Sequence, residues 1–463
     1  MTPYQQRRLF LASQLGPGDV AIIPTASEKY RNRDATYPFR ADSYFYYLTG
    51  FEEPNSILLL NHKAESILFC QPKDLEKEIW DGYRLGPENA SSKLNVTRAF
   101  SIEEIDQIAP AFLTNHSCIW YPFSSGKDTK ERIELWLEDI SKKARTGVRA
   151  PHTLRNACAI LDEMRLIKDA HEIDIMKRAC QISAAAHIKA MAFCAQALRD
   201  GTELKEYHLE AQLLHEFRRH GSEYPAYTSI VAAGANACVL HYRADKAPIL
   251  PGDLVLIDAG CELHGYASDI TRTFPANGRF TGPQRDIYEC VLQAQEAAVG
   301  ASKAGNLFSD PHDASVRVLS EGLLSLGILN PNEHGFVDDV IEQRKYAPFY
   351  MHRTSHWLGM DVHDCGSYTA ASKHEDQTAQ IDWASLDPLK SSSANTPKSR
   401  TLEPGMVLTL EPGLYIRPTP GVAEKYWNIG VRIEDDGLIT SSGVELISRD
   451  VPVRIDEIEQ LMS

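Results

Sequence analysis

The sequence predicts an α+β protein in which helices cover a curved antiparallel sheet. The first observation is an alternation in the second half of the chain, where strand-like segments such as LVLIDAG and VLTLEPG are separated by long amphipathic helices. The second observation is length. At 463 residues, the chain is too long for one comfortable hydrophobic core, so we expect two or three domains.

The first part of the chain, residues 1–165, is predicted to be a smaller α/β domain. A hairpin is indicated by the segments SILLL and SILFC, which flank the polar stretch NHKAE, and a helix by the apolar spacing in ERIELWLEDI. This helix is followed by a basic stretch that contains Gly and Pro but no apolar periodicity, SKKARTGVRAPH. We therefore expect the domain boundary between that stretch and Leu166.

The second domain, residues 166–463, is predicted to contain four long helices. Amphipathic spacing places them in LIKDAHEIDIMKRACQISAAAHIKAMAFCAQAL, ELKEYHLEAQLLHEFRRH, PQRDIYECVLQAQEAAV and DASVRVLSEGLLSLG. Residues 371–400 are instead rich in Ser, Asp, Lys and Gln, and such a stretch cannot bury enough apolar surface to order itself. We predict an exposed insertion there, either a plain surface loop or an overhang above the site described next.

Composition excludes several classes of partner. The 48 basic and 63 acidic residues give a formal net charge of −15, which argues against nucleic acid and against an anionic membrane. The first residues, MTPYQQRRLFLASQLG, contain no apolar stretch of signal-peptide length, and no run of about 20 apolar residues occurs. We expect a cytoplasmic protein. Its nine cysteines include no CxxC pair, which favours reduced thiols.

Five side chains of metal-binding types stand in the order Asp, Asp, His, Glu, Glu in the second half: Asp258, Asp269, His356, Glu411 and Glu434. Each lies beside apolar, strand-like residues. The period of two along a strand puts Glu411 on one face with Thr409, and Glu434 on one face with Arg432. The carboxylates are therefore expected to project from strand ends into one concavity.

Glycines separate the two aspartates, so the chain can turn back and set them on adjacent strands. Four carboxylates in one cleft would repel one another strongly, and some would stay protonated. Because two divalent cations cancel four negative charges, the cluster predicts a site for two metal ions. Oxygen-rich ligation with one imidazole favours Mn²⁺, Co²⁺, Fe²⁺ or Zn²⁺ over a thiolate-type structural zinc site.

Six segments of the chain resemble those of a known family: IDAGCELHGYASDITRTF, SHWLGMDVHD, TLEPGLY, VRIEDD, RNRDATYPFRADSYFYYLTGF and DEMRLIKDAHEIDIMKRA. The family that they resemble is the Xaa-Pro aminopeptidases (aminopeptidase P) of the pita-bread metallopeptidase group. The resemblance implies a pita-bread catalytic domain behind the N-terminal domain of that family. It also implies manganese as the metal and a homo-oligomer, either a dimer or a tetramer.

The resemblance further implies a role for each ligand. Asp269 and Glu434 would bridge the two metal ions, Asp258 would complete one ion, and His356 with Glu411 would complete the other. A water shared by two such ions has a lowered pKa and is a hydroxide nucleophile near neutral pH. Glu411 is then the candidate to move its proton toward the leaving nitrogen.

Three more histidines match positions that line the site in the family, where they bind substrate and stabilise the tetrahedral intermediate: His241, His352 and His363. Arg432 is predicted to orient a ligand carboxylate, and Tyr415 is a weaker candidate for the same work.

The implied substrate is a peptide with proline at the second position. An Xaa-Pro bond has no N–H and a fixed ring, so a pocket shaped for the ring is needed. Trp357 and the aromatic residues of YPAYTS and RNRDATYPF are candidates for that pocket. Asp34 or Tyr37 could reach it from a neighbouring subunit.

Other readings stay open. A prolidase shares the five ligands but cleaves only Xaa-Pro dipeptides. A methionine aminopeptidase leaves the large N-terminal domain unexplained. Some pita-bread proteins are non-catalytic interaction modules or metal-free hydrolases, but those lose ligands, and this chain has all five.

Overall fold

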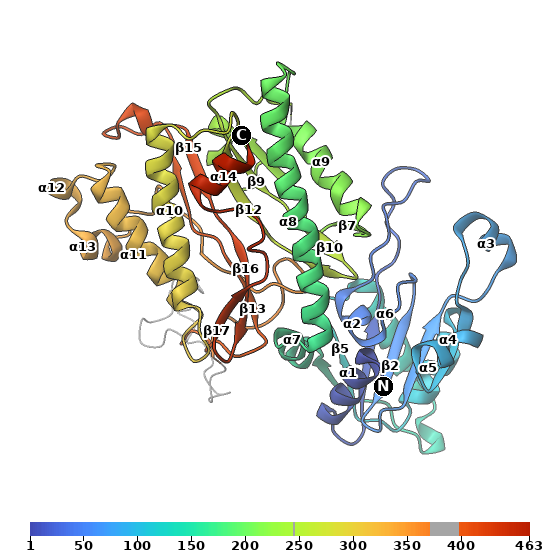
Figure 1. Cartoon of the computed structure of the whole chain (residues 1–463). Coiled ribbons are helices and arrows are strands. Elements are labelled where there is room, and N and C mark those ends of the chain that lie inside the picture. The colour runs from blue at the N-terminus through green and yellow to red at the C-terminus, as the bar shows by residue number, and fades with distance from the viewer. Residues whose placement is uncertain (244–245, 371–397) are drawn as a thin grey trace. The chain divides into compact units, whose positions relative to one another are not determined.

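The computed structural model describes residues 1–243, 246–370 and 398–463. It divides into two compact units, Met1–Met164 and Arg165–Ser463, and helix α7 (Cys158–Leu166) crosses the division (Figure 1).

The first unit is built on a six-stranded mixed sheet with the order β4-β3-β2-β1-β5-β6. Its strands are β1 (Asp19–Pro24), β2 (Ile57–Asn61), β3 (Ser66–Cys70), β4 (Arg98–Ser101), β5 (Cys118–Tyr121) and β6 (Thr153–Asn156). The predicted hairpin is confirmed, because β2 and β3 pair antiparallel. Asn61 closes its turn, since its side-chain oxygen accepts from the backbone N–H groups of Lys63 and Glu65.

The helices of this unit are α1 (Pro3–Gln14), α2 (Ser43–Thr49), α3 (Leu75–Asp81), α4 (Gly86–Leu94), α5 (Ile105–Leu113) and α6 (Lys127–Ser141). Helix α6 contains the predicted ERIELWLEDI segment. Its Trp136 is buried in one apolar cluster with Ile22, Leu59 and Phe69 of the sheet, and the indole N–H donates to Asp106 over 2.8 Å. The first unit thus closes around an apolar core.

The second unit contains α8 (Ala170–Arg199), α9 (Glu206–Arg219), α10 (Gly282–Ala301), α11 (Asp310–Ser325), α12 (Pro331–His334), α13 (Val337–Glu342) and α14 (Ile455–Leu461). The first four are the predicted long helices. Helix α8 begins with a capping box in which Asp169 and Glu172 each accept the other's backbone N–H. Within the described ranges, no helix is long and apolar enough to cross a bilayer.

Strand pairing in the second unit is antiparallel throughout the described residues. The strands are β7 (Tyr224–Pro225), β8 (Ile230–Ala233), β9 (Leu254–Asp258), β10 (Cys261–Leu263), β11 (Tyr266–Ala267), β12 (Thr271–Pro275), β13 (Val407–Leu410), β14 (Gly413–Ile416), β15 (Ile429–Arg432), β16 (Asp435–Thr440) and β17 (Gly443–Leu446). Helix α8 packs on β10 and β11, and α10 packs on β13, β14 and β15. Figure 1 shows the strands between these two groups of helices, as the sequence predicts.

Most of the predicted insertion, residues 371–397, lies outside the described residues. Its last residues are part of the folded unit. Ser399 forms an isolated antiparallel β-bridge with Thr369. The backbone of Arg400 makes two hydrogen bonds: its carbonyl accepts from Phe308 N–H over 2.7 Å, and its N–H donates to the Tyr368 carbonyl over 2.9 Å. The exposed stretch therefore cannot extend to residue 400.

Candidate metal centre

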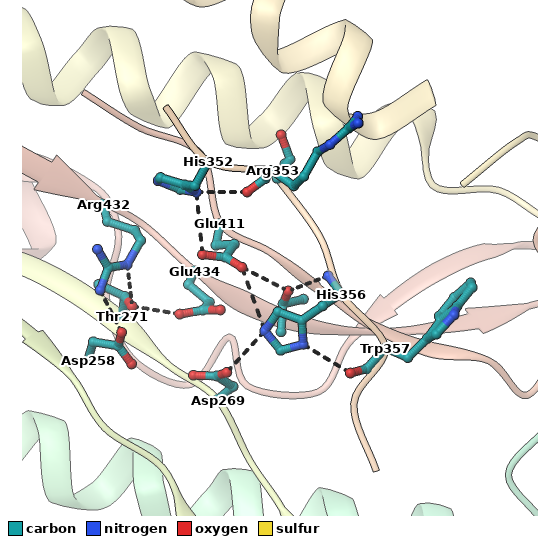
Figure 2. A network of polar contacts seen from close by, with 12 residues as sticks. Asp258, Asp269, Thr271, His352, Arg353, His356, Trp357, Glu411, Arg432 and Glu434 are labelled. Carbon is teal, nitrogen blue, oxygen red and sulfur yellow. Dashed lines mark hydrogen bonds and ion pairs between the residues drawn. The ribbon is translucent and has the colours of Figure 1, made fainter. Parts of the chain in front are cut away.

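The five predicted ligands converge on one cavity of about 980 Å³ in the second unit. Figure 2 shows their side chains pointing toward a common centre from separate segments. Asp258 ends β9, Asp269 lies just ahead of β12, Glu411 follows β13, Glu434 lies between β15 and β16, and His356 lies in the loop beside β13.

The two aspartates are neighbours because β9 and β12 pair antiparallel, with Asp258 opposite Thr271. Between them the chain turns at His264 and Gly265, both with positive φ, as a tight hairpin turn requires. At Gly260, a Cβ atom would lie 1.7 Å from a backbone carbonyl oxygen, so only glycine fits this close approach of the two strands. The predicted adjacency of the aspartates is confirmed.

Tyr227 holds both aspartates from one side. Its hydroxyl lies 2.6 Å from Asp258 Oδ1 and 2.5 Å from Asp269 Oδ1. From behind, the backbone N–H of Asp269 donates to Asp436 Oδ2 over 3.0 Å. These contacts fix the side-chain and main-chain positions of the pair.

The imidazole of His356 is oriented by its backbone and its neighbours. Thr409 N–H donates to the His356 carbonyl, and the His356 N–H donates to the Thr409 hydroxyl, so the loop is anchored to β13. The ring Nδ1 donates to the Trp357 carbonyl over 2.9 Å. Nε2 is left facing Asp269 Oδ2 at 3.5 Å and Glu411 Oε1 at 3.6 Å, which is the orientation a metal-binding histidine needs.

The pKa values of the clustered acids indicate that added positive charge would stabilise their ionised forms. Burial raises the pKa of Glu434 well above its usual value, and the charges of Asp269, Glu411 and Asp258 raise it further. Burial likewise raises the pKa of Glu411 to about 7. Burial alone would lower the pKa of His356, but its contacts with Asp269 and Glu411 outweigh that effect and raise the pKa to about 9.

The donor set fits divalent metal ions. Ligand atoms of Asp269, His356 and Glu434 all lie within 4.8 Å of one another, and Asp258 and Glu411 flank them in the same cavity. Carboxylate oxygens with one imidazole nitrogen suit manganese, cobalt, iron or zinc.

A hydrogen-bonded network supports the ligands from the β15 side (Figure 2). Arg432 donates to Asp258 Oδ2 over 2.5 Å and to the Thr271 hydroxyl over 3.1 Å, and that hydroxyl donates to Glu434 over 2.6 Å. Arg432 also donates to the Tyr415 hydroxyl over 3.0 Å. One guanidinium thus touches one proposed ligand directly and reaches a second through Thr271.

The three further predicted histidines line the same cavity. His352 Nδ1 lies 2.7 Å from the Arg353 carbonyl, and its Nε2 lies 2.8 Å from the Tyr415 hydroxyl. Burial lowers the pKa of His352 to about 3, so the ring is neutral. The ring of His363 lies 4.4 Å from that of His356, and burial lowers its pKa as well. His241 is exposed at the cavity wall.

One predicted pocket residue is placed differently. Trp357 is fully buried, with 0% of its surface exposed, and it stacks on Tyr368 at a centroid distance of 5.6 Å. It therefore cannot touch a substrate. The aromatic side chains that do line the cavity include Tyr368, Phe308 and Tyr227, and Tyr227 comes from the predicted YPAYTS segment. The SHWLG segment does place its histidine in the site, but its tryptophan packs beneath it.

Sequence reasoning did not single out Thr271, Thr409 or Asp436 as supports of the ligands. The spacing of two residues carried a signal for the threonines, because Thr271 follows Asp269 and Thr409 precedes Glu411 by two positions. A hydroxyl on the same strand face as a ligand is placed to bond to a carboxylate. No such signal exists for Asp436, which reaches Asp269 from a distant strand.

Comparisons with known proteins agree with this geometry. Residues 174–441 match the metallopeptidase family M24, and residues 4–120 match the N-terminal domain of aminopeptidase P. The first match covers more than half of the chain, so this protein belongs to metallopeptidase family M24 and is a hydrolase.

Similar proteins cover nearly the whole chain. A Xaa-Pro aminopeptidase of Haemophilus influenzae is 43% identical, over 99% of this chain and 97% of the relative. The structure of Pseudomonas aeruginosa aminopeptidase PepP is 44% identical with a TM-score of 0.90, over 99% and 97% of the two chains. A zinc-substituted Escherichia coli aminopeptidase P in complex with product is 41% identical with a TM-score of 0.89, over the same shares. The predicted family and the pita-bread fold are thereby confirmed.

Proposed function

We propose that this protein is a metal-dependent aminopeptidase that hydrolyses the bond between an N-terminal residue and a following proline. The observation that carries the proposal is the convergence of four carboxylates and the Nε2 atom of His356 on one cavity. The whole-chain similarity to Xaa-Pro aminopeptidases supports the choice of substrate.

Two divalent cations would be held by the five ligands, with Asp269 and Glu434 between them. Asp258 would serve one ion, and His356 with Glu411 would serve the other. When bound, such ions lower the pKa of a shared water and polarise a carbonyl. Manganese is the metal that the family resemblance favours, although the donor set also suits cobalt, iron and zinc.

The chain's own groups then orient and move protons. Tyr227 and Arg432 hold Asp258 by its two separate oxygens, so that carboxylate cannot rotate. Glu411 is the group proposed to accept a proton and pass it toward the proline nitrogen, because burial raises the pKa of its carboxyl to about 7, near the working pH.

The histidines contact the substrate. His363 is exposed beside His356, where its ring can donate to the oxygen of a tetrahedral intermediate. His352 and His241 line the walls on which the peptide would lie. Tyr415 sets the orientation of His352 and is itself held by Arg432.

The testing experiment combines metal analysis with peptide cleavage. Exhaustive chelation should abolish hydrolysis, and Mn²⁺ or Co²⁺ should restore it. Ala-Pro-Ala should be cleaved, while its N-acetylated form and Ala-Ala-Ala should be cleaved far more slowly. Cleavage of the dipeptide Ala-Pro alone would instead identify a prolidase. Full activity in verified metal-free protein would refute the two-metal mechanism.

We also propose that the protein is cytoplasmic and homo-oligomeric. One surface of the first unit supports self-association: four large apolar side chains on and after α3 are exposed, namely Leu75, Ile79, Trp80 and Tyr83. Large apolar side chains exposed together on one short segment commonly mark a protein interface. Light scattering of the purified protein, with Trp80→Ser as the variant, tests whether a second copy covers it.

A further inference from the structure

A chain of three hydrogen-bonded side chains reaches the cavity wall beside the proposed ligands, and sequence reasoning assigned no role to any of them. Thr354 and Tyr350 belong to the segment that carries His352, and His312 lies in the first turn of α11. Thr354 Oγ1 is 2.5 Å from the Tyr350 hydroxyl and 3.0 Å from His312 Nδ1. In the part of the chain that the structure describes, neither hydroxyl has another hydrogen-bond partner.

Burial fixes the direction of these hydrogen bonds. Tyr350 is 1% exposed and Thr354 is 0% exposed, so each hydroxyl proton needs an acceptor within the chain of three. The Tyr350 proton has one acceptor in reach, Thr354 Oγ1. Thr354 must then donate its own proton to His312 Nδ1. If Thr354 donated to Tyr350 instead, the Tyr350 hydroxyl proton would have no acceptor. This assignment places the ring proton of His312 on Nε2.

His312 is therefore a neutral donor with an available N–H. Burial, together with the charges of Arg353 and Arg344, lowers its pKa to about 4. The side chain lines the same cavity as the five ligands. No acceptor for Nε2 is found among residues 1–243, 246–370 and 398–463.

The position of this donor is tied to the metal cluster. The carbonyl of Thr354 accepts the backbone N–H of Glu411 over 2.9 Å, so the residue that holds His312 also holds a proposed ligand. His352, two residues earlier, packs its ring at 4.9 Å from that of Tyr350 (its own place in the site is drawn in Figure 2). The hydrogen bond to Thr354 therefore links the ring of His312 to the segment that carries these groups.

We propose that His312 donates its Nε2 hydrogen to an acceptor oxygen of the peptide on the proline side of the scissile bond. The inference rests on the proposed aminopeptidase function. The amino end of the peptide would lie at the carboxylate cluster, and proline has no N–H. Beyond the scissile carbonyl, the first groups that the peptide offers are therefore acceptors, which are the proline carbonyl and then the next carbonyl or the terminal carboxylate.

The test pairs variants with substrates that differ in acceptors. His312→Phe removes the donor, His312→Gln keeps an amide N–H near the Nε2 position, and His215→Phe, on the exposed face of α9, is the control. Ala-pyrrolidide has the scissile amide but no proline-side oxygen. Ala-Pro-NH₂ adds the proline carbonyl, and Ala-Pro-Ala adds a further residue with its carboxylate. Where the pyrrolidide is cleaved too slowly, its inhibition constant against Ala-Pro-Ala replaces kcat/KM.

The expected result for His312→Phe is a loss of about tenfold in kcat/KM for Ala-Pro-Ala, the size of one neutral hydrogen bond, with normal metal content. Ala-pyrrolidide should be unaffected, and His312→Gln should recover part of the loss. A loss already present with Ala-Pro-NH₂ assigns the proline carbonyl, and one seen only with Ala-Pro-Ala assigns the later oxygens. Equal losses on all three substrates, or none, would overturn the inference. A wild-type protein that processes none of them overturns the proposed function as well.

Discussion

The two units of this protein differ in the side chains that stand at the ends of their buried strands. Strands β1, β2 and β3 of the first unit are buried along nearly their whole length and contribute mainly apolar residues to one cluster. In the second unit, β9 and β13 are equally buried, yet each ends at or just before a carboxylate, Asp258 and Glu411. Burial of these first-unit strands stabilises the fold, whereas burial at the ends of β9 and β13 also raises the pKa of clustered carboxyl groups.

Two buried arginines show the same difference. Arg8 of the first unit donates to the carbonyls of Leu48, Leu94 and Asn95, at the ends of α2 and α4. It satisfies carbonyls that lack helical partners. Arg432 of the second unit donates to a carboxylate and two hydroxyls of the site. The first buried arginine therefore stabilises the backbone, and the second holds side chains of the candidate site.

The largest expected effect comes from removing a carboxylate at the centre of the cluster. Glu434→Ala takes away a proposed bridge between two cations, so metal content and turnover should fall together. We expect turnover to fall by more than about 10³-fold, since metal ions supply several kcal/mol of stabilisation. Bound metal and kcat are measured on the same preparation. Retention of both metals would show that Glu434 is not a ligand.

The next effect concerns stability in the second unit. Asp364 lies 2.6 Å from Arg165 and 2.9 Å from Lys168, and both cations are 1% exposed. Burial opposes its ionisation, but the charges of Lys168 and Arg165 outweigh burial and lower its pKa. Asp364→Asn should cost about 3–5 kcal/mol in unfolding free energy at neutral pH.

The pH dependence of that loss has a definite sign. A carboxylate with a depressed folded pKa contributes stability above its unfolded pKa, and this is lost as pH falls through the folded value. The gap between wild type and Asp364→Asn should therefore be full at pH 7 and shrink below about pH 4, the ordinary aspartate value. Urea unfolding across this range measures it. A gap independent of pH would mean that packing, not charge, is lost.

A third change separates catalysis from metal binding. His363→Ala should keep near-normal metal content while kcat falls by about 10²–10³, the cost of one oxyanion-type interaction. The ring lies beside His356 but is exposed, which is why the ligands should not need it. Loss of metal in this variant as severe as in Glu434→Ala would make His363 a ligand or a structural support.

The smallest effect is expected in the first unit and affects stability alone. Arg8→Met leaves three carbonyls without their donor, which should cost about 1–3 kcal/mol of unfolding free energy. Metal content and kcat should be unchanged in protein that remains folded. A fall in kcat without loss of metal would show that the first unit contributes to the site. The two buried arginines would then not differ in function as described.

Much of the candidate site could be predicted from the sequence because the patterns that indicate it are local. The alternation of two residues along a strand places Glu411 and Thr409 on one face without any knowledge of distant partners. Gly260 and Gly265 indicate that the chain turns back between the two aspartates. In the structure, Gly265 lies in the turn and Gly260 lies where the two strands approach closely. The four long helices were likewise visible in their apolar spacing.

The misses involve contacts between segments far apart in sequence. Trp357 looks like a pocket residue because it sits between His356 and the next apolar residues, but it packs against Phe308 and Tyr368 and is 0% exposed. Asp436 bonds to Asp269 across more than a hundred positions. Neither contact leaves a pattern in the local sequence.

By itself, the sequence predicted the order of the five proposed ligands, the helices between them and the family, because each prediction depends on residue type and short-range period. Only the tertiary structure decided how these groups are held: which nitrogen of His356 faces the carboxylates, how Arg432 reaches two ligands, and where His312 carries its proton. The direction of a hydrogen bond depends on every donor and acceptor within about 3 Å. Those partners come from distant parts of the sequence and are brought together only in the folded chain.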